Sequence, residues 1–271
     1  LDYVPVGMEG TNEGLLEISN IPPVDFGKRL KYLIRYPYGC SEQTTSSAFP
    51  QLFLEDIMEM DHRLKDFTSK NIKAAIERLS LMQKSNGGFR YWPSAVEAND
   101  WVSSYVGHFM LEAEAKGYSL PPGFKKKWIK YQKRAAKNWT HYSKDHYRYY
   151  HYYHLMQAYR LYTLALAGSP DFSSMNRFRQ QSGINKLAKW RLAAAYAMAG
   201  KPEIAKEITA DLDFQTNEFD RMNHSFGSSL RDKAMILETL VVMNEREKAA
   251  PLVLELSKKV SSGYWYSTQS T

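Results

Sequence analysis

The sequence predicts an all-α protein, an α/α toroid of antiparallel helical hairpins preceded by a short extended N-terminal segment. Apolar residues recur at helical spacing from Asp25 almost to the end of the chain. The connections are short and carry a glycine, often with a proline beyond it, and strand-like alternation is nearly absent after residue 24. Repeated hairpins also build open solenoids, but no fixed period such as that of tetratricopeptide arrays is matched. Residues 191–199 are almost all apolar, which favours the closed toroid.

Residues 1–24 differ from the rest of the chain. Apolar residues at 15–18 alternate partly with polar neighbours between Gly14 and the pair at 22–23, which predicts a strand or an extended segment. The chain opens on Leu1 without an initiator methionine, so we expect it to be a piece of something longer. Asp25 is a suitable N-cap for a first helix, and we expect the toroid to occupy residues 25–271.

The helices can be placed in order along the chain. The first carries Phe26 and Leu30 and ends before Pro37, because proline disfavours helical geometry in the residue before it. The second begins at Ser41 and is interrupted at Pro50. The expected helices span residues 26–34, 41–61, 69–84, 100–116, 123–138, 145–167, 184–199, 202–211, 228–244 and 246–259.

Composition and charge limit the class of protein. With 271 residues, of which 44% are hydrophobic and 24% charged, the chain can bury a sizeable core as one large domain. It has no signal-like start and no apolar run that spans a bilayer, so we expect membrane attachment only through an upstream anchor, if any. The net charge of +7 includes lysines at 125–137 that share a helix with Trp128 and Tyr131. We interpret them as the solvated face of an amphipathic helix and expect no nucleic-acid partner.

The segment 36–43, Tyr-Pro-Tyr-Gly-Cys-Ser-Glu-Gln, contains the only cysteine of the chain. If the sulfur of Cys40 attacks the side-chain carbonyl of Gln43 and ammonia leaves, the two side chains join as an internal thioester, an acyl group activated for transfer. Gly39 permits the backbone to fold the cysteine towards the glutamine. Glu42 is a candidate proton donor or acceptor for ring closure, or simply an acidic residue favoured in a first helical turn. The alternative for Cys40 is an inert buried thiol.

A thioester must be protected from water until it is needed, and aromatic side chains near Cys40 are candidates for that role. Tyr36 and Tyr38 flank the cysteine. Tyr91 and Trp92 follow a loop signal, Asn-Gly-Gly-Phe at 86–89, and we expect them to form the opposite wall of the site. Exclusion of water slows hydrolysis without altering the acyl group.

Residues 36–43 resemble the signature of the thioester domain of the alpha-2-macroglobulin and complement superfamily, and the wider pattern resembles its bacterial branch. The matching blocks occur in family order and span nearly the whole chain, at 35–46, 86–93, 164–168, 231–234 and 265–269. The resemblance implies an α/α toroid with a thioester between Cys40 and Gln43, covered by a tyrosine at the position of Tyr36. It also implies that residues 1–24 are the tail of a preceding β domain. In relatives the terminal Ser-Thr-Gln block begins one more helix, so we expect the toroid to lack its last helix.

The function that this resemblance implies is covalent inhibition of proteases. In the family a protease cuts a bait region elsewhere in the molecule, the shield moves away, and the thioester acylates a lysine of the trapped protease. The implied partners are target proteases and other domains of the same full-length chain. The reaction is single-use, so the resemblance implies an inhibitor rather than an enzyme, located in the periplasm or at the cell surface.

A histidine sets the acceptor in some members of this superfamily. In complement relatives that prefer hydroxyl acceptors, a histidine from a later loop attacks the thioester first. The best candidate here is His141, which comes just before a predicted helix. None of the four histidines of this segment matches the complement histidine block: His141, His146, His151 and His154. The alternative is a Tyr/His-rich helix surface, and direct aminolysis is the working hypothesis. His151 and His154 lack a third ligand, so we expect no metal and no other cofactor.

Two other functions stay open from the sequence. Some glycan-processing enzymes also have an α/α toroid fold. In such an enzyme, the Tyr/His-rich segment with Asn138 could line a sugar cleft. That function needs a convergent acid and base, and the sequence presents no carboxylate pair for it. A helical scaffold with an inert cysteine is the other alternative, and it would show no reactivity towards amines.

Overall fold

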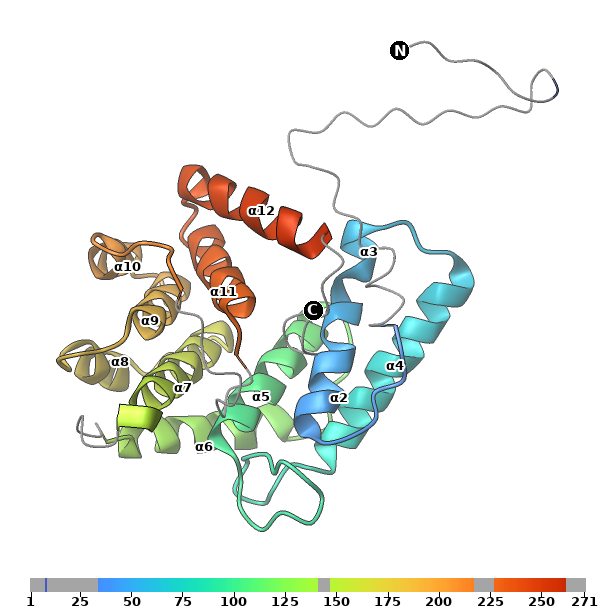
Figure 1. The fold of residues 1–271 in the computed structure, drawn as a ribbon. Coiled ribbons are helices and arrows are strands. Elements are labelled where there is room, and N and C mark those ends of the chain that lie inside the picture. The colour runs from blue at the N-terminus through green and yellow to red at the C-terminus, as the bar shows by residue number, and fades with distance from the viewer. Residues whose placement is uncertain (1–7, 9–33, 141–146, 217–226, 262–271) are drawn as a thin grey trace.

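The computed structural model describes residue 8 and residues 34–140, 147–216 and 227–261 (Figure 1). Within these ranges every regular element is a helix, and two isolated β-bridges join Gln83 to Phe89 and Arg90 to Ala98. The elements are α2 (Ser41–Ala48), the 3-10 helix η1 (Pro50–Phe53), α3 (Leu54–Ile57), α4 (His62–Ser80), α5 (Asp100–Ala115), α6 (Phe124–Asn138), α7 (Tyr147–Leu166), α8 (Phe172–Arg179), α9 (Lys186–Met198), α10 (Pro202–Thr209), α11 (Ser229–Val242) and α12 (Arg246–Ser261). The predicted segment 1–24, nearly all of the predicted helix at 26–34 and the terminal block at 265–269 lie outside the described residues.

The helices form an α/α toroid, which confirms the predicted fold class. α5 packs on α7, α7 on α9 and α9 on α11, and α2 lies against α5. These helices follow one another around the inside, whereas α4, α6, α8, α10 and α12 lie outside them (Figure 1). Elements from both ends of the described chain therefore belong to one body.

Side-chain caps explain where many of the helices begin. A carboxylate oxygen of Asp61 accepts a hydrogen bond from the backbone N–H of Leu64 at 2.7 Å, which starts α4. Asn99 and Asn185 cap α5 and α9 in the same way. At the other end, the expected glycine caps are confirmed after α5, α7 and α9, where a left-handed residue stops the helix: Gly117, Gly168 and Gly200.

Most predicted helices agree closely with the structure, but three places differ. The predicted helix at 41–61 is divided into α2, η1 and α3, and Pro50 is the first residue of η1. α4 begins at His62, well before the predicted start at Ser69, because Asp61 caps it. α8 was not predicted at all, and it lies in the connection between α7 and α9.

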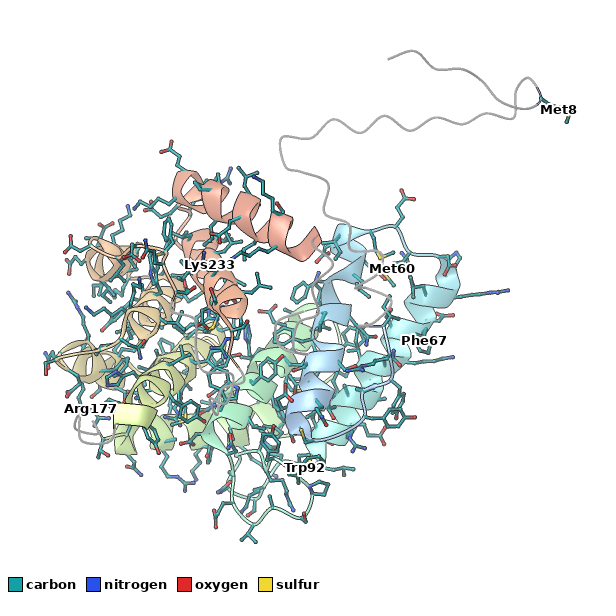
Figure 2. The ribbon with its side chains drawn as sticks, viewed as in Figure 1. Met8, Met60, Phe67, Trp92, Arg177 and Lys233 are labelled. Carbon is teal, nitrogen blue, oxygen red and sulfur yellow. The ribbon has the colours of Figure 1, made fainter. Side chains whose placement is uncertain are left out.

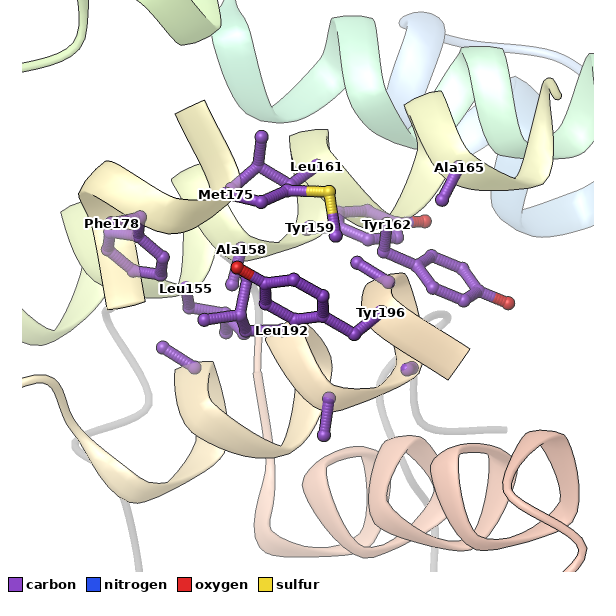
Figure 3. Packing of buried hydrophobic residues seen from close by; sticks show 14 of the residues in the cluster. Leu155, Ala158, Tyr159, Leu161, Tyr162, Ala165, Met175, Phe178, Leu192 and Tyr196 are labelled. Atoms are coloured by element: carbon purple, nitrogen blue, oxygen red, sulfur yellow. The ribbon is translucent and has the colours of Figure 1, made fainter. Parts of the chain in front are cut away.

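The first large cluster of buried apolar residues lies where α7, α8 and α9 meet. Figure 3 shows Tyr159 of α7 and Phe178 of α8 near Leu192 and Tyr196 of α9. All four side chains are buried. This cluster holds together the half of the toroid that lies away from the single cysteine.

A second buried cluster joins α2, α4, α5 and α6. Its largest side chain is Trp128 of α6, whose indole nitrogen donates a hydrogen bond to the carbonyl oxygen of Ser103 at 2.7 Å. A Cβ atom at position 107 would come within 2.2 Å of the Trp128 ring, so only Gly107 lets α5 and α6 approach this closely. The cluster fixes α4 and α5 against α2, the helix that follows the cysteine.

The lysine-rich helix α6 is amphipathic, as predicted. It buries Phe124, Trp128 and Tyr131, whereas Lys126 and Lys130 are exposed. The lysines therefore form the solvated face of a helix that packs on the core. Across the described ranges, no helix combines the length and the apolar character needed to cross a bilayer.

Candidate functional site

Cys40 is the N-cap residue of α2. Its sulfur accepts a hydrogen bond from the backbone N–H of Gln43 at 3.5 Å, and its own backbone N–H donates to the side-chain oxygen Oε1 of Gln43 at 3.2 Å. This reciprocal pattern is a capping box in which a thiol and an amide replace the usual hydroxyl and carboxylate. The two side chains that the sequence predicts to react therefore lie over the same helical turn. Cys40 is only 2% exposed, while Gln43 is exposed to solvent.

The turn before the cysteine depends on Gly39. Its φ angle is +100°, in the region that favours glycine. A Cβ atom here would also lie 2.1 Å from Oε1 of Gln43, so a larger residue would displace the amide. The carbonyl oxygen of Gly39 accepts hydrogen bonds from Nη2 and Nε of Arg78 at 2.8 and 3.3 Å. Arg78 belongs to α4, which thus holds the turn from outside.

The loop after α4 lies against the start of α2. The backbone N–H of Ser41 donates to the carbonyl oxygen of Tyr91 at 3.0 Å, and the Ser41 hydroxyl donates to that of Arg90 at 2.8 Å. The side chain of Tyr91 lies close enough to that of Cys40 for the two to interact electrostatically. Burial, followed by the nearby Cys40 side chain and the Glu42 carboxylate, raises the pKa of Tyr91 well above its usual value. The loop after α4 thus brings Tyr91 to the start of α2, beside Cys40.

The other three candidate shielding residues lie at the surface around this site. Tyr36 and Tyr38 are 45% and 72% exposed, and their ring centroids are 4.5 Å apart. Trp92 is 49% exposed and lies beside the Tyr91 ring, with 6.1 Å between the centroids. Figure 2 shows Trp92 near the start of α2. Tyr36, Tyr38 and Trp92 form what we call the aromatic rim.

Glu42 is buried at the start of α2 and takes part in a short chain of hydroxyl groups. The Ser46 hydroxyl donates to Oε1 of Glu42 at 2.8 Å and lies 3.1 Å from the hydroxyl oxygen of Tyr105. Since the single Ser46 proton is directed to Glu42, Tyr105 donates to Ser46. Burial raises the pKa of Tyr105 well above its usual value, so Tyr105 remains a donor at neutral pH. The chain leads from the carboxylate into the interior of the toroid.

Sequence reasoning missed Arg78, Ser46 and Tyr105. Arg78 gave no signal, because the bond to Gly39 joins a turn to a helix far along the chain. Ser46 offered a weak one, since it lies one helical turn after Glu42 and therefore on the same face.

The histidines contribute no metal site in the described part of the chain. His141 lies outside the described residues, so its proposed role stays a prediction. His154 is buried between Trp139 and Phe178, and its Nδ1 accepts a hydrogen bond from the backbone N–H of Asn185 at 3.4 Å. Among the residues that the structure describes, no group of three potential ligands could hold a metal ion.

A small cavity of about 150 Å³ lies among the inner helices, between Phe49, Tyr105, Tyr159 and Arg191. Nη1 of Arg191 pairs with the carboxylate of Glu238 at 2.6 Å. Glu238 also accepts a hydrogen bond from the Tyr162 hydroxyl at 2.8 Å. This carboxylate is therefore engaged in both an ion pair and a hydrogen bond.

A family model described as the A-macroglobulin TED domain matches residues 18–131, a range that contains Cys40, Gln43 and Tyr91. Alpha-2-macroglobulin from Escherichia coli (strain K12) is 27% identical over 278 residues, covering 96% of this chain and 16% of the relative. Alpha-2-macroglobulin from Xylella fastidiosa (strain Temecula1) is 25% identical over 94% of this chain and 16% of the relative. The chain thus spans 16% of the length of these curated relatives.

Solved structures agree with these relatives. Native E. coli alpha-2-macroglobulin, in a form spanning domain MG7 to the C-terminus, superposes with a TM-score of 0.77 at 27% identity, over 93% of this chain and 41% of that one. Salmonella alpha-2-macroglobulin reacted with methylamine gives a TM-score of 0.75 at 27% identity, over 92% of this chain and 17% of that one. Both the sequence and the fold are similar to bacterial alpha-2-macroglobulins over nearly the whole chain.

Proposed function

The chain belongs to the TED domains of the bacterial alpha-2-macroglobulin family, and on that premise we propose that it is the reactive domain of a protease inhibitor, with an internal thioester between Cys40 and Gln43. The observation that carries this proposal is the capping box, in which Cys40 and Gln43 hold each other's reactive groups over one turn. Because the chain spans 16% of its curated relatives, the activity of the whole protein is part of the proposal.

Bond formation follows from this geometry. The Cys40 sulfur attacks Cδ of Gln43, the bond from Cδ to the amide nitrogen breaks, and ammonia leaves with the thiol proton. Negative charge develops on Oε1 in the tetrahedral intermediate. The backbone N–H of Cys40 lies 3.2 Å from this oxygen and can stabilise the charge. Glu42 is the proposed proton carrier, and Ser46 orients its carboxylate.

The acceptor that we propose is a lysine amine of a protease. The amine attacks Cδ of Gln43, the bond to sulfur breaks, and the protease is joined to the chain through an amide. Gln43 is exposed, which favours direct attack by an amine from solvent. Each molecule reacts once, so the protein is an inhibitor and not a turnover enzyme.

The trigger in this proposal lies outside the chain. A protease cuts a bait region elsewhere in the full-length protein, and the covering of the thioester by Tyr91 and the aromatic rim is lost. Two solved relatives support a protease trigger, since they are described as trypsin-activated and as activated by porcine elastase. Other domains of the same protein are the further partners, and we propose a periplasmic or cell-surface location.

The test is the intact mass of the full-length protein before and after methylamine. We expect the mass to be short by one ammonia, no free thiol, and a methylamine adduct on Gln43 that appears together with the Cys40 thiol. The variant Cys40→Ala should show none of these and should no longer tether a protease. A free Cys40 thiol beside unmodified Gln43 in the untreated protein would contradict the proposal and favour the inert-cysteine scaffold.

A further inference from the structure

The hydroxyl group of Ser46 has an unusual partner for a serine inside a helix. Such hydroxyl groups commonly donate to the backbone carbonyl oxygen four residues earlier. The neighbouring Thr45 does so, with 2.7 Å to the carbonyl oxygen of Ser41. Ser46 donates instead to a side-chain oxygen of the residue four positions earlier, Oε1 of Glu42, at 2.8 Å. A contact from outside α2 explains this direction.

Tyr105 of α5 supplies that contact. Its hydroxyl oxygen lies 3.1 Å from the hydroxyl oxygen of Ser46, to which it donates. A donor on the Ser46 oxygen leaves the single proton of Ser46 to be directed at Glu42. Because consecutive hydrogen bonds polarise one another, this donor also strengthens the bond from Ser46 to the carboxylate. The orientation of a carboxylate in α2 therefore depends on a residue of another helix.

The ring of Tyr105 is fixed by packing away from the cysteine. It lies against Phe49, with 5.9 Å between the ring centroids, and packs on the buried cluster of α7, α8 and α9. It also lines the small cavity among the inner helices, beside His108 and Tyr159. The Tyr105 hydroxyl is thus held at α2 by the packing of α5, not by residues 39–43.

A carboxylate held in this way serves the proposed ring closure. Glu42 takes the proton of the Cys40 thiol as the sulfur attacks Cδ of Gln43. It then gives that proton to the amide nitrogen as the bond from Cδ to nitrogen breaks. Thioester and ammonia are the products, and the carboxylate ends as it began. Only the ionised form of Glu42 can accept the proton, and the hydrogen bond from Ser46 favours that form.

We propose that Tyr105 is a positioning residue for ring closure, which orients the Glu42 carboxylate through Ser46. This inference rests on the proposed thioester function and adds a residue of α5 that acts through another side chain. Opening of the ring by ammonia is the reverse of closure and crosses the same barrier, so a positioning residue changes both rates by the same factor. A residue that only supports the fold around the cysteine shifts the equilibrium between the two states.

The first experiment follows the opening of the thioester by ammonia in the full-length protein. Ammonia restores the amide of Gln43 and frees the Cys40 thiol, which a thiol reagent detects. We expect Tyr105→Phe, which keeps the ring, to slow opening by roughly three- to ten-fold, as for one lost neutral hydrogen bond. After ammonia is removed, closure followed by intact mass should be slower by the same factor. Unaltered rates in Tyr105→Phe would overturn the inference.

A matched control and an equilibrium measurement distinguish this role from a general loss of stability. Tyr196→Phe removes a hydroxyl bond of 2.7 Å to Oδ1 of Asn176, between α9 and α8, and should leave both rates unchanged. At a fixed concentration of ammonia, the proportion of thioester at equilibrium should be the same in Tyr105→Phe and in the unaltered protein. A shifted proportion would overturn the inference, because Tyr105 would then support the ring itself.

Variants of the two intermediate groups locate the effect. Ser46→Ala removes the same contact from the side of α2 and should slow opening, and adding Tyr105→Phe to it should not slow the reaction further. Glu42→Gln should slow opening by roughly one hundred-fold or more, as for a lost general base. Further slowing in the double variant, or an unaltered rate in Glu42→Gln, would contradict a path through these groups and overturn the inference.

The outcomes separate this inference from the proposed function. If the unaltered protein shows no ammonia loss, the thioester function fails and the role of Tyr105 fails with it. If the thioester forms and Tyr105→Phe behaves like Tyr196→Phe, only the role of Tyr105 fails. Slower opening and closure at an unchanged equilibrium support both.

Discussion

Residues 39–43, which contain the proposed thioester, form what we call the reactive turn, and its geometry depends most directly on Gly39. Its φ angle is +100°, and a Cβ atom added at this position would lie only 2.1 Å from Oε1 of Gln43. Gly117 offers a comparison, because its φ of +89° is similar but nothing lies within 4 Å of the position of a Cβ atom. Comparing a substitution at Gly39 with the same substitution at Gly117 therefore separates the effect of backbone strain from that of a clash with the Gln43 amide.

We expect Gly39→Ala to prevent thioester formation. Strain in the left-handed region should cost about 1–2 kcal/mol, and the methyl group should push the Gln43 amide away from the sulfur. Gly117→Ala should lose a similar amount of stability and still form the thioester. Intact mass reports the thioester and thermal unfolding reports stability. Normal loss of ammonia in Gly39→Ala would show that the capping geometry is not required.

Only some contacts around Glu42 can be predicted from a single sequence. Cys40, Gln43 and Glu42 stand in one short segment, so their proximity follows from local structure alone. Tyr105 enters the same chain of hydroxyl groups from α5, and its contact with Ser46 exists only once α2 and α5 have packed. No spacing rule could have predicted it.

At the scale of elements, α4 positions the reactive turn through Arg78. We expect Arg78→Ala to destabilise the turn, because the carbonyl oxygen of Gly39 loses two N–H donors of one charged guanidinium group. Each hydrogen bond to a charged group contributes about 1.5–3 kcal/mol. The thioester should then form incompletely and hydrolyse faster in buffer. The half-life of the ammonia-deficient mass in purified protein measures this.

Two further variants sharpen the test of Arg78. Arg78→Lys keeps the charge but offers a single donor group, and it should give an intermediate half-life. Lys73→Ala, an exposed position on the same helix, should have no effect. If Arg78→Ala matches Lys73→Ala, the clamp on Gly39 contributes nothing to the reactive turn.

The helices that were predicted well are those with a cap and a long apolar pattern. α5, α6 and α9 begin and end close to the predicted residues because local signals are enough to define them. α8 has only eight residues and follows a connection that contains glycine and proline, so its apolar pattern is too short to distinguish it from that connection. Asp171, whose side chain accepts from the backbone N–H of Ser174, was the cap that could have revealed it.

At the scale of the whole molecule, Glu238 joins four inner helices around the central cavity. From α11 it pairs with Arg191 of α9, accepts from Tyr162 of α7 and lies 3.9 Å from Nε2 of His108 of α5. Burial opposes its charge, but Arg191 and then His108 outweigh burial and hold the pKa of Glu238 below its usual value. The ionised carboxylate is therefore favoured by the folded state.

This lowered pKa predicts a dependence of stability on pH. The contribution of Glu238 is fully present above the unfolded pKa of about 4.3 and is lost as the pH falls through the folded value. We expect Glu238→Gln to lower the free energy of unfolding at pH 7 by roughly 2 kcal/mol, less than for a fully buried pair because the side chain is 35% exposed.

Thermal unfolding of both proteins between pH 7 and pH 3 tests this. The difference between the unaltered protein and Glu238→Gln should shrink as the pH is lowered. Glu203→Gln, at an exposed position in α10, should match the unaltered protein throughout. A difference that stays constant with pH would mean that the ionised form of Glu238 gives no special stability.

The capping box of α2 has a consequence for how the chemical state of the domain is expressed in its structure. Sulfur is a weak hydrogen-bond acceptor, and cysteine is not among the residues that cap helices well, so α2 begins with a poor cap while the thiol is free. In the proposed mechanism, ring closure would replace that contact with a covalent bond, and aminolysis would remove the bond again. Cys40→Ser should therefore give a firmer but inert helix. The covalent bond of the proposed thioester would order the first turn of α2. Loss of that order after aminolysis would show that the single reaction has taken place.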